Sequence, residues 1–284
     1  MALCHWLFSQ MKVSVIISTS SSPSLLQKCL WGFEYQTYNN FDVILTEEGQ
    51  DPNTAEVVKD FSERGVLNIR HLSDPTGRAR EIAMLNRAIA STNSDYLIFA
   101  NDHCIPRNDF VEIHMKRSRK QHFLSGGYFS VPHKVAKLIS KEDIATLFAF
   151  NWRWLLYNGL QPGKLIGMTN QRLLDRLFEK FSSTVPWCGA NASAWRDDIL
   201  SINGFNEDLS VFDYDLDFGE RLVKRGVNGI SVRHEAICLC QEGKRTIRNG
   251  HERKSDRNRT RLQTGAWAVN GISKAGTADV KERV

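Results

Sequence analysis

The chain has 284 residues, 42% of them hydrophobic, and 37 Lys and Arg against 32 Asp and Glu give a formal net charge of +5. This length and composition predict one large α/β domain or two small ones, and they exclude a chain that is disordered throughout. The mild basic excess suits a phosphorylated ligand or an anionic membrane surface, and we expect no nucleic-acid partner.

Residues 1–10 are too short for a membrane span and lack the pattern of a signal peptide, so we expect a disordered lead there or an alternative start before Met11. No stretch of the sequence has the length and apolarity of a transmembrane helix. The six cysteines form no C-x-x-C pair, and we expect reduced thiols in a cytosolic protein. Cys238 and Cys240 are expected on opposite faces of one strand.

The first half of the chain alternates apolar runs of strand length with segments whose apolar residues recur at helical spacing. This order predicts right-handed crossovers and a parallel, doubly wound sheet with helices on both faces. We expect strands at 11–19, 41–45, 68–72 and 96–100, and helices at 24–38, 54–61 and 79–90.

Polar side chains follow the expected strands where each one ends. Ser18 and Thr19 follow the first, Glu47 and Glu48 the second, and Asn101-Asp102-His103 the fourth. Parallel strands present their carboxyl ends at one edge, so these side chains should share a crevice. The last trio could coordinate a cation or bond a sugar hydroxyl; alternatively, it only opens a turn before Pro106. No G-x-G-x-x-G or P-loop motif occurs, which argues against a dinucleotide fold or a P-loop NTPase.

The second half contains a segment dense in aromatic side chains and a segment with three closely spaced aspartates. Residues 142–181 are expected to be mostly helical, and their dense aromatic side chains favour a core role over sugar stacking or membrane contact. A short helix is expected at 197–201. Asp213, Asp215 and Asp217 precede an amphipathic helix, whose dipole favours ionised carboxylates at its N-terminus.

The end of the chain changes character after a strand expected at 230–239. Residues 243–261 are strongly basic, and they form either a solvated face or a segment that folds over an anionic diphosphate. Beyond Leu262 we expect a frayed terminus.

Five short motifs occur in a characteristic order. They are V-S-V-I-I-S-T with the later Q-T-Y; Arg80 with L-N-R-A-I at 85–89; S-D-Y-L-I-F-A-N-D-H-C-I-P at 94–106; G-A-N at 189–191 with I-N-G-F-N-E at 202–207; and D-L-D-F-x-x-R-L at 215–222. In this order they resemble the family 2 glycosyltransferases with the GT-A fold, over residues 11–239, and the I-N-G-F wording is similar to a galactosyltransferase-like C-terminal half.

The resemblance implies a GT-A fold: a Rossmann-like, doubly wound mixed sheet with helices on both faces and a helical acceptor-side insertion. It implies an enzyme that moves a hexose or N-acetylhexosamine from a nucleotide diphosphate donor, expected to be a UDP-sugar, to a hydroxyl of a glycan or lipid-linked acceptor, with inversion. Such a transfer needs a base for the acceptor proton and positive charge for the departing diphosphate. It would build a cell-surface or secreted glycan in the cytoplasm, with peripheral contact to the inner face of the membrane.

The resemblance also implies roles for individual residues. Asp215 is the expected catalytic base, and His103 stands at the position of the metal ligand that ends the family's D-x-D. The nucleotide is expected at Ser18, Thr19, Glu48, Arg80, Asn101 and Asp102, and the donor and acceptor sugars at Trp187, Gly189, Ala190, Asn191 and Asp217.

The metal position departs from the family pattern, because D-x-D is replaced here by Asn101-Asp102-His103, and the downstream metal-binding His by Cys240 or Gln241. Mg²⁺ favours oxygen ligands, so an imidazole ligand favours Mn²⁺ over Mg²⁺. Asp102 is an alternative ligand. A third option has no metal, and residues 244–261 then neutralise the diphosphate.

Two other functions stay open at this point. The first is a degenerate GT-A domain that binds a nucleotide sugar or a glycan without catalysis. The second is a nucleotidyltransferase, which would need a Gly-rich, Lys-bearing first loop that residues 18–23 lack. We expect residues 11–130 to bind the nucleotide sugar, 131–242 to form the acceptor and catalytic half of the same domain, and 243–284 to be a basic C-terminal segment.

Overall fold

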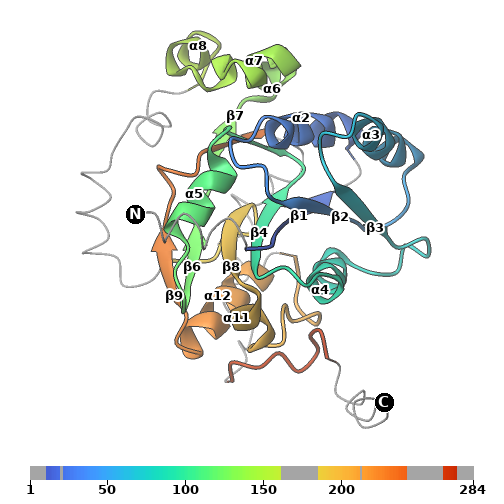
Figure 1. Cartoon of the computed structure of the whole chain (residues 1–284), viewed down its shortest axis with the longest axis vertical. Coiled ribbons are helices and arrows are strands. Elements are labelled where there is room, and N and C mark those ends of the chain that lie inside the picture. The colour runs from blue at the N-terminus through green and yellow to red at the C-terminus, as the bar shows by residue number, and fades with distance from the viewer. Residues whose placement is uncertain (1–10, 20–21, 161–184, 212, 242–264, 274–284) are drawn as a thin grey trace.

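A seven-stranded mixed sheet lies at the centre of the molecule (Figure 1). The computed structural model describes residues 11–19, 22–160, 185–211, 213–241 and 265–273. The strand order is β3-β2-β1-β4-β8-β6-β9. These strands are β1 (Val13–Thr19), β2 (Asp42–Glu47), β3 (Ile69–Ser73), β4 (Tyr96–Asn101), β6 (His122–Ser125), β8 (Asn191–Trp195) and β9 (Asn228–Ser231).

The first four strands pair in parallel, as the alternating sequence predicts, whereas β8 runs antiparallel to both β4 and β6. Every residue of β1 is buried because helices cover both faces of the sheet. The strand period places Val15 and Ile17 in one apolar cluster and Ile16 in another. The mixed α/β architecture confirms the expected fold class.

Helices from both halves of the chain pack on the two faces of this sheet (Figure 1). One face is covered by α2 (Pro23–Glu34), α3 (Pro52–Glu63) and α5 (Phe110–Arg117). The other is covered by α4 (Glu81–Ser91), α11 (Arg196–Leu200) and α12 (Tyr214–Lys224). The two sequence halves therefore share one core, with β4 and β8 in direct contact.

A second, three-stranded sheet has the order β5-β10-β7, formed by β5 (Cys104–Pro106), β10 (Cys238–Gln241) and β7 (Phe129–Val131). A third apolar cluster joins it to the helices at the top of Figure 1. These are α6 (His133–Leu138), α7 (Lys141–Ala145), a 3₁₀ helix (Phe148–Phe150) and α8 (Trp152–Tyr157). The helical segment expected at 142–181 is thus a series of short helices up to residue 160, and its remainder lies outside the described residues.

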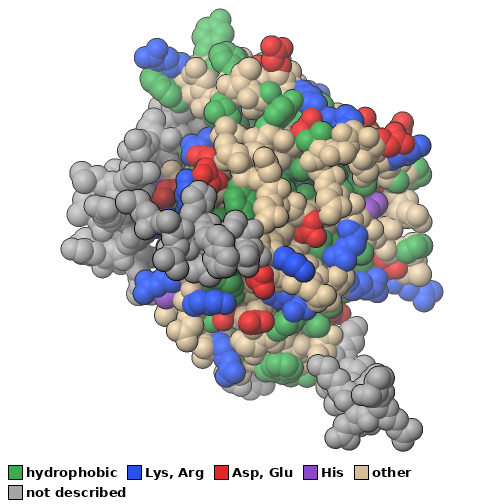
Figure 2. Space-filling view, viewed as in Figure 1, with side chains coloured by type: hydrophobic (Ala, Val, Ile, Leu, Met, Phe, Trp, Pro, Cys, Tyr) green, Lys and Arg blue, Asp and Glu red, His purple; other side chains and the backbone are tan. Residues whose placement is uncertain are grey.

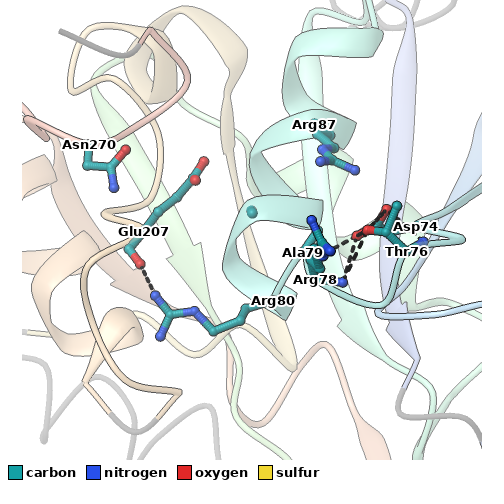
Figure 3. A pocket seen from close by; sticks show the side chains of 9 residues that line it. Asp74, Thr76, Arg78, Ala79, Arg80, Arg87, Glu207 and Asn270 are labelled. Atoms are coloured by element: carbon teal, nitrogen blue, oxygen red, sulfur yellow. Dashed lines mark hydrogen bonds between the residues drawn. The ribbon is translucent and has the colours of Figure 1, made fainter.

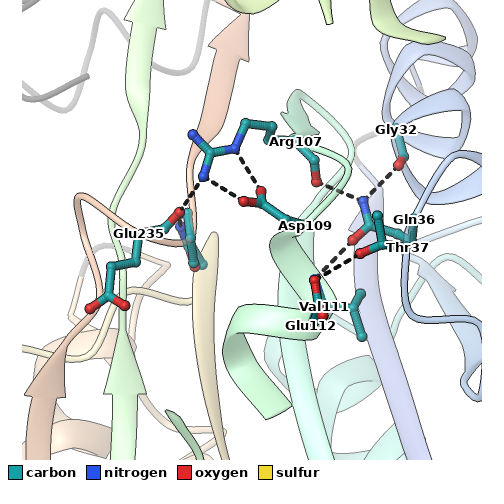
Figure 4. Close-up of polar contacts among 10 residues, drawn as sticks. Gly32, Gln36, Thr37, Arg107, Asp109, Val111, Glu112 and Glu235 are labelled. Carbon is teal, nitrogen blue, oxygen red and sulfur yellow. Dashed lines mark hydrogen bonds and ion pairs between the residues drawn. The ribbon is translucent and has the colours of Figure 1, made fainter. Parts of the chain in front are cut away.

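Gln36, from the Q-T-Y motif, fastens α2 to α5 (Figure 4). Its amide nitrogen donates to the carbonyls of Gly32 and Arg107, at 2.8 and 2.7 Å, and its oxygen accepts the N–H of Val111 at 2.8 Å. The side chain is buried, so each polar atom of the amide needs such a partner. Nearby, Arg107 forms a bidentate pair with Asp109. Gln36 therefore has a structural role, because it holds α2 and α5 in position.

The structure corrects two expectations for the end of the chain. The strand expected at 230–239 is two strands, β9 and β10, that belong to different sheets. Residues 265–273 do not fray: the amide of Asn203 donates to the carbonyls of Ala268 and Ser273, at 2.6 and 2.9 Å, and accepts the N–H of Ser273. The expected lead at 1–10 and the basic run at 243–261 lie outside the described residues. None of the described helices combines the length and apolarity needed to cross a membrane.

Candidate active site

The ends of β1 and β4 bring two of the predicted polar pairs together. Ser18 lies beside Asn101 in the parallel register, and its hydroxyl donates to the Asn101 amide oxygen at 2.9 Å. The hydroxyl of Thr19 donates to Oδ2 of Asp102 at 2.8 Å. The carboxyl edge of the sheet therefore carries a hydrogen-bonded polar cluster.

Asp102 is directed inward and orients His103. Asp102 is 1% exposed, and its Oδ1 lies 3.2 Å from Nδ1 of His103. Burial lowers the pKa of His103, but hydrogen bonds to Asp102 and Cys240 outweigh it and raise the pKa to about 10. At this pKa both ring nitrogens are protonated at neutral pH, so Nε2 can act as a ligand only after it loses its proton, while Nδ1 keeps its proton toward Asp102.

The side chains that could hold a metal here include sulfur. His103, Cys104 and Cys240 each offer one ligand atom, and these atoms lie within 4.8 Å of one another. A hard cation such as Mg²⁺ prefers several oxygen ligands, whereas this group offers one imidazole and two thiols. The donor set thus fits a cation that tolerates nitrogen and sulfur, and it does not fit Mg²⁺.

The end of β2 separates its two glutamates. Glu47 is buried, with Oε2 3.0 Å from Nε2 of His71. Glu48 is exposed, and its Oε1 accepts the N–H of Glu81 at 2.7 Å, at the N-terminus of α4. Of the two, only Glu48 is therefore placed to reach a ligand.

Arg80, the residue before α4, lines a pocket of about 300 Å³ (Figure 3). Its guanidinium donates to the carbonyl of Glu207 at 2.6 Å, across to the segment after α11. Arg78, Arg87 and Asp74 also line this pocket. Arg80 and Glu48 thus both lie at the N-terminus of α4, but the Arg80 side chain extends away from it toward Glu207.

Asn86 joins two of the sequence motifs. Its amide nitrogen donates to the Phe205 carbonyl at 2.9 Å, and its oxygen accepts the Phe205 N–H at 2.9 Å. Gly204 has a φ of +69°, and a Cβ added there would lie 2.5 Å from the Asn86 oxygen. The L-N-R-A-I and I-N-G-F-N-E motifs are therefore in contact and hold α4 against the turn that follows α11.

Asp215 is the second residue of α12 and is partly exposed. The backbone N–H of Gly189 donates to its Oδ2 at 3.1 Å, and a Cβ at Gly189 would lie 2.8 Å from its Oδ1. Burial and the nearby Asp215 carboxylate raise the pKa of the Cys188 thiol to about 12, so this thiol stays protonated at neutral pH. The first turn of a helix favours an ionised carboxylate, the form that can accept a proton.

Asn191, expected at the sugar site, is fully buried and connects three separate segments by hydrogen bonds. Its amide nitrogen donates to the carbonyls of Gly127 and Ala236, both at 2.7 Å, and its oxygen lies 2.9 Å from Nε2 of His114. Burial lowers the pKa of His114 to about 4, and its other nitrogen lies 2.7 Å from the Ser193 hydroxyl. No sequence signal marks His114, a lone histidine in an amphipathic helix.

Three further residues expected near the sugars lie toward the core. Trp187 is 3% exposed and packs against Phe99, Phe123 and Phe218. Asp217 is 2% exposed and pairs with Arg221 at 2.7 Å, and Ala190 is buried as well. These positions argue against direct sugar contact by Asp217 and Trp187, because a ligand would have to displace core packing or a buried ion pair.

Comparisons with known proteins agree with this architecture. The family described as Glycosyl transferase family 2 matches residues 14–159. Glycosyltransferase GlyA of Streptococcus pneumoniae serotype 4 is 26% identical over 106 residues, which cover 37% of this chain and 15% of that protein.

Two solved structures share the fold at 14% identity. The mannosyltransferase PcManGT from Pyrobaculum calidifontis, in complex with GDP-Man and Mn²⁺, superposes with a TM-score of 0.57 over 86% of this chain and 65% of that chain. Residues 1–349 of S. aureus TarS, in complex with UDP-GlcNAc, superpose with a TM-score of 0.50 over 82% of this chain and 60% of that one. The chain thus spans less than two thirds of the length of each of these relatives.

Proposed function

The chain belongs to glycosyl transferase family 2, and on this premise we propose that it transfers a sugar from a nucleotide diphosphate donor to a hydroxyl of a glycan or lipid-linked acceptor, with inversion. The sugar is a hexose or an N-acetylhexosamine, and the donor is a UDP-sugar. Support comes from the GT-A architecture, which PcManGT with GDP-Man and TarS with UDP-GlcNAc share.

The observation that carries this proposal is the placement of Asp215. It lies in the first turn of α12, accepts the Gly189 N–H and is partly exposed. Asp217, two residues on, is buried in an ion pair with Arg221. Of the two aspartates in the first turn, Asp215 is therefore the one that can accept the proton of an acceptor hydroxyl as that oxygen attacks the sugar.

The donor nucleotide is assigned to the carboxyl edge of the sheet. Ser18, Thr19 and Asn101 offer hydroxyl and amide groups there, and Glu48 and Arg80 lie at the start of α4. A divalent cation at His103, with Mn²⁺ favoured over Mg²⁺, would supply positive charge to the departing diphosphate. Asp102 holds the imidazole in position.

The same enzyme is proposed to act in the cytoplasm at the inner face of the membrane. Exposed apolar side chains gather on α6, the 3₁₀ helix and α8, at the top of Figure 2. Phe148 and Trp152 are 42% and 43% exposed, and exposed Lys134, Lys137 and Arg153 accompany them. Aromatic and basic side chains together suit the surface of an anionic membrane.

The substitution Asp215→Asn tests the catalytic assignment. We expect the turnover of UDP-sugars to fall by roughly 10²–10⁴-fold, the usual contribution of a general base, while nucleotide binding is retained. Asp213→Asn is the matched control, because Asp213 is the residue before α12 and accepts the Ser210 hydroxyl. Equal turnover of natural protein and Asp215→Asn would show that Asp215 is not the base.

Calorimetric titration with UDP and GDP, each with Mn²⁺, Mg²⁺ or EDTA, tests the donor site. We expect UDP to bind more tightly than GDP, and Mn²⁺ to strengthen binding more than Mg²⁺. Nucleotide binding without transfer or hydrolysis across a panel of UDP-sugars would instead favour a degenerate binding domain. Failure to bind any nucleotide would contradict both functions.

A further inference from the structure

A histidine and two cysteines converge where the two sheets meet. Cys104 and Cys240 are direct partners across the antiparallel strands β5 and β10. The neighbouring N–H of Gln241 donates to the His103 carbonyl at 2.7 Å, which makes Cys104 and Cys240 a non-hydrogen-bonded pair. In such a pair the side chains lie closest to one another.

Both cysteines of β10 face this point. Cys104 forms side-chain hydrogen bonds with Cys238 as well as with Cys240. The expectation that Cys238 and Cys240 point to opposite faces is therefore wrong, since residues two apart on a strand share a face. Cys238 in turn contacts Asn191 and the Gly127 carbonyl. Cys240 lies next to His103 and is therefore the better placed of the two cysteines to bind the same metal ion as His103.

His103 is held in the orientation of a metal-bound histidine. Its Nδ1 lies 3.2 Å from the Asp102 carboxylate, which Thr19 holds on its other oxygen. A carboxylate behind one imidazole nitrogen, with the second nitrogen on the metal, is a frequent arrangement at zinc sites. The His103 side chain is 24% exposed, whereas Cys104 and Cys240 are buried, so the group opens to solvent on the histidine side.

We propose that His103, Cys104 and Cys240 form a site for Zn²⁺ or a similarly thiophilic divalent cation, with Asp102 as the positioning residue of His103. The three ligand atoms lie within 4.8 Å of one another. Small side-chain shifts bring two sulfurs and one nitrogen to the bond lengths of about 2.3 and 2.0–2.1 Å that zinc requires. Three protein ligands leave one coordination position for water or an oxygen of a ligand.

Binding of the metal replaces protons. Zinc takes thiolates and neutral imidazole, so the two thiols and the imidazolium each release a proton to solvent on binding. The proposal deepens the proposed function, on which it rests only for the role of the cation at the diphosphate. Metal binding itself requires no nucleotide sugar, so it can be measured even if the transferase assignment fails.

Cobalt substitution provides the test. The full-length protein is stripped with a chelator under reducing conditions and titrated with Co²⁺, and its absorption spectrum is recorded. We expect a near-ultraviolet thiolate-to-cobalt charge-transfer band, saturating at one metal per chain and abolished by Zn²⁺. Simple competition between Zn²⁺ and Mn²⁺ is not diagnostic, because most sites bind Zn²⁺ more tightly. A cobalt complex without the charge-transfer band would overturn the thiol ligands.

Variants assign the band to residues. Cys240→Ser and Cys104→Ser should each weaken the band, and His103→Gln should reduce zinc retention at least 10-fold, the lower end of what lost metal-site contacts cost. Cys188→Ser is the matched control and should keep the full band, because Cys188 is not part of the group. The spectrum of the natural protein remains decisive if a buried cysteine variant fails to fold. Peptide mapping that shows a Cys104–Cys240 disulfide persisting under the reducing conditions of the titration would also overturn the proposal.

Discussion

His114 shows how a single buried residue can set the response of the whole protein to pH. Both ring nitrogens have partners, Ser193 and Asn191, and burial lowers the pKa of His114 from 6.5 to about 4. In the unfolded chain the same histidine takes up a proton near pH 6.5. The unfolded state therefore binds more protons between these two pKa values, and stability is lost as pH falls from about 6.5 toward 4.

We accordingly expect the natural protein to lose about 2 kcal/mol of unfolding free energy between pH 7 and pH 5 through this residue. The variant His114→Gln keeps an amide that can bond Ser193 and Asn191 and does not titrate, so its unfolding free energy should change less. Urea unfolding at several pH values measures both slopes. Identical slopes for the two proteins would rule out His114 as the source.

Gly189 leaves room for the Asp215 carboxylate, because it has no side chain. A Cβ at Gly189 would lie 2.8 Å from Oδ1 of Asp215, so Gly189→Ala must displace the carboxylate. Because that atom ends a flexible side chain, we expect little change in melting temperature and a loss of roughly 10²-fold in turnover, typical of a misplaced catalytic group. Gly265→Ala is the control, because its nearest contact is 4.0 Å away. A melting temperature that falls together with the turnover would point to a structural effect.

Several motif residues connect whole elements of the fold through buried side-chain amides. Gln36 connects α2 to α5, Asn86 connects α4 to the turn at Gly204, and Asn191 connects β8 to the Ala236 carbonyl, just before β10. Each is a buried side-chain amide that satisfies backbone groups which the regular ladders leave unpaired. The motifs shared with the family therefore indicate a shared fold at least as strongly as they indicate shared catalytic residues.

The substitution Gln36→Ala tests this role. It leaves the Val111 N–H and two carbonyls without their buried partner, which should cost about 1–3 kcal/mol of unfolding free energy. Gln50→Ala, at an exposed glutamine, should change the unfolding free energy by less than about 0.5 kcal/mol. Equal effects of the two substitutions in urea unfolding would contradict the assignment.

At the scale of the molecule, residues 265–273 complete the core on the α4 and α12 face. Ile272 and Ala266 pack against that apolar cluster, and the Glu207 N–H donates to the Asn270 carbonyl at 2.8 Å. The side chain of Asn203, a residue with a φ of +64°, exchanges three hydrogen bonds with this segment, and its carbonyl accepts the Ile272 N–H at 3.1 Å. The segment therefore supports the turn that Arg80 and Asn86 also contact.

Truncation tests this contribution. Removal of residues 265–284 should destabilise the protein by at least about 1–3 kcal/mol, because Asn203 is then left without its buried partners. Removal of residues 274–284 alone keeps those partners and serves as the control. Thermal unfolding of the two truncated proteins should separate them, and equal melting temperatures would contradict a structural role for residues 265–273.

The expected strands of the first half, their order and their carboxyl-end polar residues all follow from local patterns. Strands rich in β-branched residues with both faces apolar must lie in a sheet that is covered by helices on both sides. The segments between them have apolar residues at helical spacing, so each pair of strands is connected by a crossover helix. The motif order placed the family correctly as well. Asp215 and Asp217 could also have been separated from the sequence, because residues two apart on a helix point to different sides.

Tertiary structure decided several contacts that the local sequence does not show. The pairing of Cys104 with Cys240 depends on the register of two short strands far apart in the sequence. The burial of Asn191 and Trp187 depends on packing between the two sheets and α12, which local sequence does not encode. The sequence by itself thus determined the strands and helices of the first half, their order, and the family. That Cys104 joins His103 and Cys240 was decided only by the fold, because long-range register is fixed by the packing of the entire core.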